Sequence, residues 1–198
     1  MDLTALLIPA VILVALTSLG LLISLDWRWS IATLAVQYMG VFVLVSVSWS
    51  LELAVAKMVA GWMAGAVLGV AVASSPEAWR QEEQFWPSGW LFRLMAAGMV
   101  GAALYSLLPG ISGWLPLTNQ PILWGGLILV SMGLLQLGFT AQPLRAVIGL
   151  LTALSGFEII YAALETSTLV AGLLAGANLG LALAGAYLLV APGMEAEE

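Results

Sequence analysis

About seven apolar segments occupy nearly the whole chain, each close to the roughly twenty residues that cross a bilayer core as an α-helix. In lipid a helix satisfies its backbone hydrogen bonds within the segment, so helices are expected of such runs. The expected spans are 3–25, 30–49, 51–73, 91–111, 121–139, 143–164 and 168–190. The first is interpreted as a retained helix, because it is too long for a signal-peptide core. The sequence therefore predicts an all-α, polytopic transmembrane helix bundle of about seven helices.

The composition excludes several classes of function. Hydrophobic residues make up 62% of the 198 residues and charged residues 8%, which leaves no soluble catalytic domain between the spans. The chain has no Cys and no His, so disulfides, the usual zinc and haem ligands and Ser–His or Cys–His catalysis are absent. Five basic residues are too few for a phosphate-binding surface. We therefore expect no catalytic activity of its own, no metal or other cofactor, and no nucleic acid partner.

The arginines predict the orientation of the bundle. Arg28, Arg80, Arg93 and Arg145 lie in or beside the first, third and fifth connections, and the other connections between spans contain no Lys or Arg. The positive-inside rule makes the arginine side cytoplasmic. The N-terminus is then outside and the acidic C-terminus cytoplasmic, and the expected location is the inner (plasma) membrane of a cell, as a multi-pass protein.

The connection 74–90 mixes aromatic and charged residues. It fits either a short interfacial helix with Trp79 and Trp86 at the level of the lipid headgroups, or a structural loop at that level. The alternative is a docking surface for a cytoplasmic subunit.

Two spans carry small residues at every fourth position, a spacing that lets helix backbones approach closely in lipid. These residues are Gly61, Gly65 and Gly69 in 51–73, and Gly172, Gly176 and Gly180 in 168–190. We expect both faces to pack inside the bundle or against partner subunits, and to carry no chemistry themselves.

Glu158 and Lys57 are charged residues deep within the spans. An acid or base at mid-membrane costs about 2.5–3.5 kcal/mol even on a mild scale, so each needs a partner or a function. Lys57 lies roughly 9 Å and Glu158 roughly 10 Å from the same predicted outer surface, given the helical rise per residue. This similar depth predicts a direct or water-bridged pair. Three interpretations stay open: a structural ion pair, a proton relay, and contacts with other subunits.

Further polar residues could extend a hydrated path from Glu158 to the outside. Glu165 lies two turns farther along nearly the same helix face, and Asn178 lies in the last span. Other candidates on the span of Glu158 are Thr152, Ser155 and Tyr161. A polar residue of this kind usually makes a hydrogen bond to a neighbouring helix. A glutamate at a helix end, such as Glu165, is usually solvated.

Three sequence motifs in 120–190 carry a family resemblance. They are the basic turn Pro143-Leu144-Arg145, the segment Ser155-Gly156-Phe157-Glu158-Ile159-Ile160, and the segment Asn178-Leu179-Gly180-Leu181-Ala182-Leu183-Ala184. This part of the chain resembles the small three-helix K subunit of respiratory complex I, a family also seen in multisubunit cation/proton antiporters. The resemblance implies that Glu158 belongs to a central hydrophilic axis along which protons move.

The whole chain is similar in layout to component E of hydrogenase-4-type complexes, a seven-helix protein with a K-like C-terminal half. The segments Leu16-Thr17-Ser18-Leu19 and Ala56-Lys57-Met58-Val59 support this likeness. The chain departs from both families, because Gly176 stands where the K subunit has a second acid, and Leu154 where component E has its acid. The resemblance implies an N-terminal four-helix part, 1–111, and a K-like three-helix part with an acidic tail, 112–198.

Together these features predict an integral membrane subunit of a complex I-like, membrane-bound hydrogenase-type or antiporter-related assembly. It would contribute to proton or sodium translocation coupled to redox chemistry, with other membrane subunits and the lipid bilayer as its partners. Glu158 would be the protonatable station, and Lys57, Glu165 and Asn178 would lie beside it on the ion pathway. The alternatives are a structural or assembly subunit with no ion path, and a stand-alone small transporter.

Overall fold

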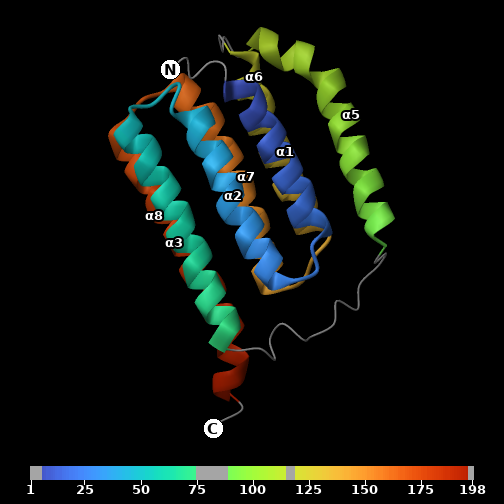
Figure 1. Cartoon of the computed structure of the whole chain (residues 1–198), viewed down its shortest axis with the longest axis vertical. Helices are drawn as coiled ribbons and strands as arrows, with labels where there is room; N and C mark the ends of the chain where they lie inside the picture. Colours follow the sequence, from blue (N-terminus) through green and yellow to red (C-terminus); the bar gives the residue numbers. More distant parts are fainter. Residues whose placement is uncertain (1–5, 75–88, 115–118, 196–198) are drawn as a thin grey trace.

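The computed structural model of the chain contains helices and no strands in the residues that it describes, which are 6–74, 89–114 and 119–195. The helices are α1 (Leu7–Ile23), α2 (Trp27–Val45), α3 (Leu51–Ser74), α5 (Trp90–Trp114), α6 (Gln120–Gly138), α7 (Pro143–Leu164) and α8 (Thr168–Glu195) (Figure 1). Six of them are long and apolar enough to cross a membrane, whereas α1, with 17 residues, is shorter. The predicted all-α, polytopic bundle is confirmed.

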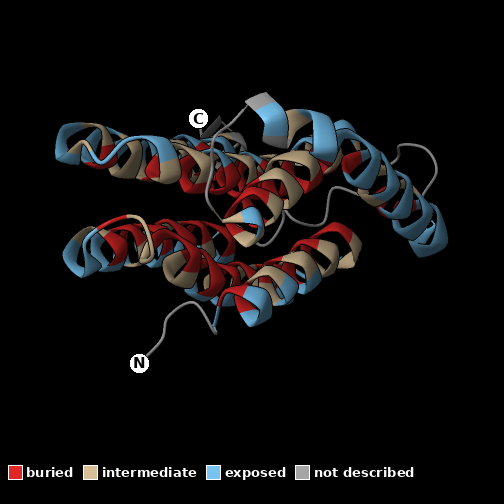
Figure 2. Cartoon of the chain, turned by 90° about the horizontal axis from the view of Figure 1, so that it is seen from above, coloured by how far each residue is buried: buried red, intermediate tan, exposed pale blue. Residues whose placement is uncertain are grey.

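Six of the helices form two layers of three (Figure 1). One layer contains α1, α2 and α3, and the other contains α6, α7 and α8, with α1 facing α6, α2 facing α7 and α3 facing α8. Short connections make consecutive helices antiparallel within each layer. The α2–α3 and α7–α8 connections lie at the same end of the bundle, so the facing helices run in the same direction. Buried residues line the space between the layers, and exposed residues cover the outer faces (Figure 2). Helix α5 lies at the edge of the bundle, against α6 and α1.

The two ends of the bundle are chemically different. One end, called here the Trp49 end, contains the α2–α3 connection, 46–50, and the α7–α8 connection, 165–167. The opposite end, called the arginine end, contains the first turns of α2, α5 and α7, which carry Arg28, Arg93 and Arg145. These arginines share one end, as the sequence predicts. The cytoplasmic placement of that end stays a prediction.

Glycines allow α6 and α7 to pack with their backbones in contact. A Cβ atom on Gly133 would lie 2.5 Å from the backbone nitrogen of Ala153, and one on Gly156 would lie 2.5 Å from the carbonyl oxygen of Gly126. No larger residue fits at such a distance, so glycine is required here. Gly126 and Gly133 are seven residues apart, as are Gly149 and Gly156, and this spacing places each pair on one helix face. The interface was not among the small-residue faces expected from the sequence.

The two faces that were expected lie in different environments. In α3, Gly61 lies directly against the Tyr38 ring of α2, so this face packs inside the bundle. In α8 the residues of the stripe are exposed, and a Cβ atom added to any of them would meet nothing within 4 Å: Gly172, Gly176 and Gly180. The α8 face therefore lies on the outer surface of the described bundle, where it packs against none of the described helices.

Helix α2 departs most from its expected span, since it covers Trp27–Val45 instead of 30–49. Asp26 explains the early start, because its carboxylate accepts a hydrogen bond from the Arg28 amide at 2.9 Å and caps the helix. The expected last turn, 46–49, is a separate turn. That turn brings Trp49 over the Trp49 end of α7, where its indole nitrogen donates to the Glu165 carbonyl at 3.1 Å.

Other expected boundaries are close to the observed ones, and α7 matches the span 143–164. Helix α5 continues past 111, so the proposed division of the chain there falls inside a helix. The connection 75–88, with Trp79 and Trp86, lies outside the described residues.

Candidate functional site

Lys57 and Glu158 form an ion pair between α3 and α7. Lys57 Nζ contacts Glu158 Oε2, and the two side chains are 3% and 0% exposed. Each residue lies about two turns from the Trp49 end of its helix. The expected pairing at similar depth is thus observed as a direct contact.

Asn178 of α8 and Tyr38 of α2 complete the arrangement, called here the Lys57–Glu158 site. Asn178 Nδ2 donates to Glu158 Oε1 at 2.9 Å, and the Tyr38 hydroxyl donates to Asn178 Oδ1 at 3.1 Å. Asn178 Nδ2 also donates to the carbonyl of Leu174, one turn earlier, at 2.9 Å. These bonds determine which way the amide points, with its nitrogen toward the carboxylate. Four helices therefore meet at one buried polar cluster.

Tyr38 contacts Lys57 as well, through the face of its ring. Lys57 Nζ lies 5.1 Å from the centroid of that ring, which is within the range of a cation–π interaction. Gly61, one turn after Lys57, leaves the space that the ring occupies. Tyr38 was not among the residues expected from the sequence, because the sequence around a tyrosine in an apolar helix does not indicate which residues of other helices it contacts.

The charges of the site are sparsely compensated. Among the described residues, Lys57 Nζ has the Glu158 carboxylate and the Tyr38 ring as partners and makes no further hydrogen bond. Removing two charges from water costs several kcal/mol per ion, and only good geometry with additional hydrogen bonds offsets this cost. A gain in stability is therefore a poor explanation for the pair, and a functional explanation gains weight.

A second buried network lies next to the site on its arginine side. Thr152 Oγ1 donates to Gln37 Oε1 at 3.2 Å, and Gln37 Nε2 donates to Ser18 Oγ at 3.0 Å. Ser18 Oγ in turn donates to the Val14 carbonyl at 2.5 Å. The network joins α7, α2 and α1, and its last acceptor is the Val14 carbonyl of α1. The oxygen and the nitrogen of the Gln37 amide both have hydrogen-bond partners. It fits a fixed link between helices better than a conducting chain.

Arg93 and Arg145 are buried, at 5% and 2% exposure, although each lies in the first turn of its helix. Each guanidinium donates to the carbonyl of Leu22 at 3.1 Å, near the C-terminal end of α1. The last carbonyls of a helix lack intrahelical partners and carry partial negative charge, so cations suit this position. Gln136 Nε2 donates to the Arg145 carbonyl at 3.0 Å and adds α6 to the cluster. Both arginines lie in the first turn of a helix at the arginine end. This position was the sequence signal that they could bind the last carbonyls of α1.

The other expected path residues are not gathered around Glu158. Glu165 is exposed at the end of α7, and its Oε1 accepts a hydrogen bond from the Thr166 amide at 3.2 Å. Ser155 is buried on α7, one turn before Glu158. The Tyr161 ring stacks on that of Phe157, with centroids 6.2 Å apart.

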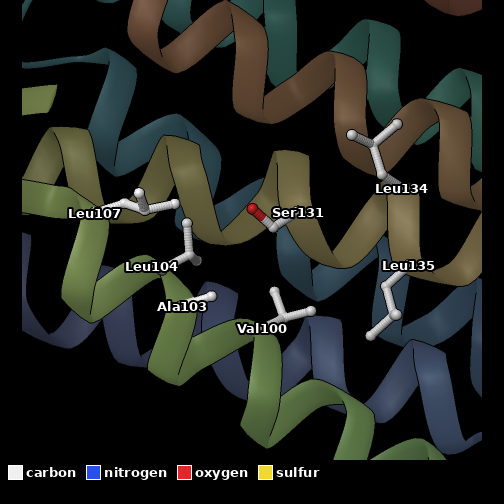
Figure 3. Close-up of a pocket in the computed structure, with 7 residues that line it drawn as sticks. All are labelled: Val100, Ala103, Leu104, Leu107, Ser131, Leu134 and Leu135. Atoms are coloured by element: carbon white, nitrogen blue, oxygen red, sulfur yellow. The ribbon is translucent and has the colours of Figure 1, made fainter.

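The described residues offer no group of three or more acidic or histidine side chains that could hold a metal ion. A groove of about 440 Å³ opens between α5 and α6 (Figure 3). Its lining residues are Val100, Ala103, Leu104, Leu107, Ser131, Leu134 and Leu135. The groove shares no residue with the Lys57–Glu158 site. The functional candidate is the Lys57–Glu158 site, because it holds the buried charges.

Comparisons with protein-family models, with curated proteins and with solved structures found no match to this chain.

Proposed function

We propose that this chain is an integral membrane subunit that contributes to proton, or sodium, translocation coupled to redox chemistry, with Glu158 as its protonatable station. One observation carries the proposal: a carboxylate and an ammonium lie fully buried where four helices of a membrane bundle meet. Ionisable residues inside membrane helices are costly, and those that occur mark ion pathways and proton relays.

The contacts of Glu158 suit the uptake and release of a proton. Its Oε1 is held by Asn178, while its Oε2 faces Lys57, so a proton could exchange at one oxygen without loss of the other bond. Lys57 Nζ lies against Oε2, so a relative movement of α3 and α7 would separate the ammonium from the carboxylate. The pair would therefore alternate between a joined and a separated state as the proton is taken up and released.

The resemblance to the K subunit and to component E supports an assembly of the complex I-like, membrane-bound hydrogenase or antiporter-related kind. The partners would be other membrane subunits, and the redox cofactors would belong to them. Gly176, which takes the place of the second K-subunit acid, is exposed on α8. Glu158 would therefore act as a single station in this chain.

The test is ion translocation by the intact assembly that carries Glu158→Gln or Lys57→Met. Both substitutions remove a charge at nearly constant volume, and both should abolish or strongly slow translocation while the assembly still forms. Glu52→Gln is the matched control, since it removes an exposed carboxylate from the first turn of the Lys57 helix and should leave the rate unchanged. Normal translocation by assembled Glu158→Gln would rule out the role of Glu158.

A structural or assembly subunit is the second candidate, and the satisfied network of Ser18, Gln37 and Thr152 favours it. That network shows that buried polar groups also serve as fixed links in this bundle. In that case the Lys57–Glu158 pair fastens α3 to α7, and loss of the pair lowers the amount of assembled complex without a change in the rate per complex. A third candidate, a stand-alone transporter, requires that the chain alone, purified in mild detergent, moves ions in liposomes.

A further inference from the structure

The two layers of the bundle divide the Lys57–Glu158 site between them (Figure 1). Lys57 and Tyr38 belong to the layer of α1, α2 and α3, and the contact between the ammonium and the ring lies within that layer. Glu158 and Asn178 belong to the layer of α6, α7 and α8, as does the hydrogen bond between them. The ion pair itself crosses between the layers. A movement of one layer against the other would therefore part the two charges and leave each with a partner in its own layer.

The Tyr38 ring is fixed within its layer by a contact that does not depend on the charge of Lys57. Its side chain is buried, at 1% exposure. Gly61 gives the ring its space, because a Cβ atom at that position would overlap the ring carbons. The hydrogen bond from the hydroxyl to Asn178 crosses between the layers, so the packing against Gly61 is the contact that moves together with Lys57. The face of the ring thus stays toward Lys57 when the layers move.

The ring is the contact left to Lys57 once the carboxylate is neutral or has moved away. Within 6–74, 89–114 and 119–195, Lys57 Nζ makes no hydrogen bond besides its ion pair with Glu158. An ammonium buried without any partner is strongly unfavourable. The quadrupole of an aromatic ring attracts a cation over its face, and the attraction is larger where water is excluded. Tyr38 can therefore offset part of the cost of the separated state.

We infer that Tyr38 is a positioning residue, and that its ring holds the Lys57 ammonium in place while the ion pair is open. Lys57 then stays beside Glu158, and the pair can re-form when the carboxyl group loses its proton. The inference rests on the proposed function for the opening of the pair in the working assembly. The attraction between ring and ammonium, however, can be measured without ion movement.

Fluorination of the ring tests this role, because fluorine withdraws electron density from the ring face and weakens the cation–π interaction with little change in size. Position 38 of the full chain is occupied by phenylalanine or by its mono-, di- or trifluorinated forms, so that the hydroxyl is missing throughout the series. The series is made in the chain with Glu158, in Glu158→Gln, which imitates the protonated carboxyl group, and in Glu158→Gln combined with Lys57→Met. The measurement is equilibrium unfolding of the purified chain in detergent micelles.

In Glu158→Gln we expect the unfolding equilibrium constant to rise with each added fluorine, by about tenfold over the series, because the ring is then the main partner of the ammonium. The chain that keeps Glu158 should show the same trend with a smaller slope, since the carboxylate shares the ammonium. The combined variant, which has no cation at position 57, should show no trend. This matched control removes any effect of fluorine on packing or on the hydrophobicity of the ring.

A flat response in both chains that keep Lys57 would overturn the inference, as would an equal slope in the chain that carries Lys57→Met. A merely structural ring predicts that equal slope, because packing does not sense the charge at position 57. These outcomes are separate from those of the proposed function, since unfolding requires no ion movement. A slope that depends on Lys57, together with normal translocation by Glu158→Gln, would retain the role of the ring and reject Glu158 as the station.

Discussion

Lys57→Met leaves the Glu158 carboxylate buried without its positive partner, and Glu158→Leu leaves the Lys57 ammonium in the same condition. The side chains are 3% and 0% exposed, so solvent screens neither remaining charge. Loss of one partner of a buried ion pair typically costs about 3–5 kcal/mol, whereas replacement of both by apolar residues is neutral or stabilises by about 1–4 kcal/mol. We therefore expect each single variant to lose about 3–5 kcal/mol of unfolding free energy, and the double variant to recover nearly all of it.

The assay is equilibrium unfolding of the purified chain in detergent micelles, with the wild type, both single variants and the double variant. The expected coupling energy between the two positions is about 6–10 kcal/mol, the sum of the two single losses, and is well above the additivity error of independent sites. Glu165→Gln on the surface of the same helix should change stability by at most about 0.5 kcal/mol. Additive losses, with the double variant the least stable of the four, would refute the view that the two charges compensate each other.

Three further predictions concern packing, hydrogen bonding and orientation. Gly133→Ala should lower the free energy of unfolding by roughly 1–3 kcal/mol, because its methyl group would collide with the backbone at Ala153, whereas Gly180→Ala on the open face of α8 should be neutral or stabilising. Unfolding in micelles distinguishes the two, and equal effects would contradict the glycine contact. Tyr38→Phe should cost about 1–3 kcal/mol in the same assay, because it leaves Asn178 Oδ1 buried without its donor. Green fluorescent protein fused to the C-terminus should fluoresce in cells, and the same fusion exported at the N-terminus should not, if the arginine end is cytoplasmic.

The helices were predictable because span length and hydropathy act locally. Helix α7 begins at Pro143 and ends before the polar segment 165–167, so the residues at its two ends determine its limits. The expected span of α2 began three residues late, because Asp26 caps the helix at Trp27, and it ended four residues late, because 46–49 forms a separate turn. Such errors come from single side chains at helix ends.

The packing of the helices was much less predictable. In lipid the outer surface of a bundle is as apolar as its interior, so hydropathy does not distinguish the two faces of a helix. Gly180 and Gly156 both occur in apolar helices, yet one is open on the surface and the other touches the backbone of α6. The partner helix decides the role of each glycine, and the sequence of one helix does not contain that information.

The site was predicted in part. Depth along the helices brought Lys57 and Glu158 to the same level, and the structure joins them. Asn178 was expected near the path and is bonded to Glu158, while Glu165 is exposed and apart from the site. Tyr38 was missed because its significance depends on three residues of two other helices. The ion-pathway role of all these residues stays a prediction.

The arrangement of the Lys57–Glu158 pair has a consequence for how the chain is made. Lys57 enters the membrane with α3, and Glu158 follows about a hundred residues later, which at translation rates of about 5–20 residues per second means a delay of roughly 5–20 seconds. During that time the ammonium has no carboxylate to meet, and its insertion is unfavourable by about 2.5–3.5 kcal/mol. Its position near one helix end lets it reach the headgroup region while it waits. Arrival of α7 would then draw α3 to its final depth, so that the last helices synthesised complete the insertion of the first ones.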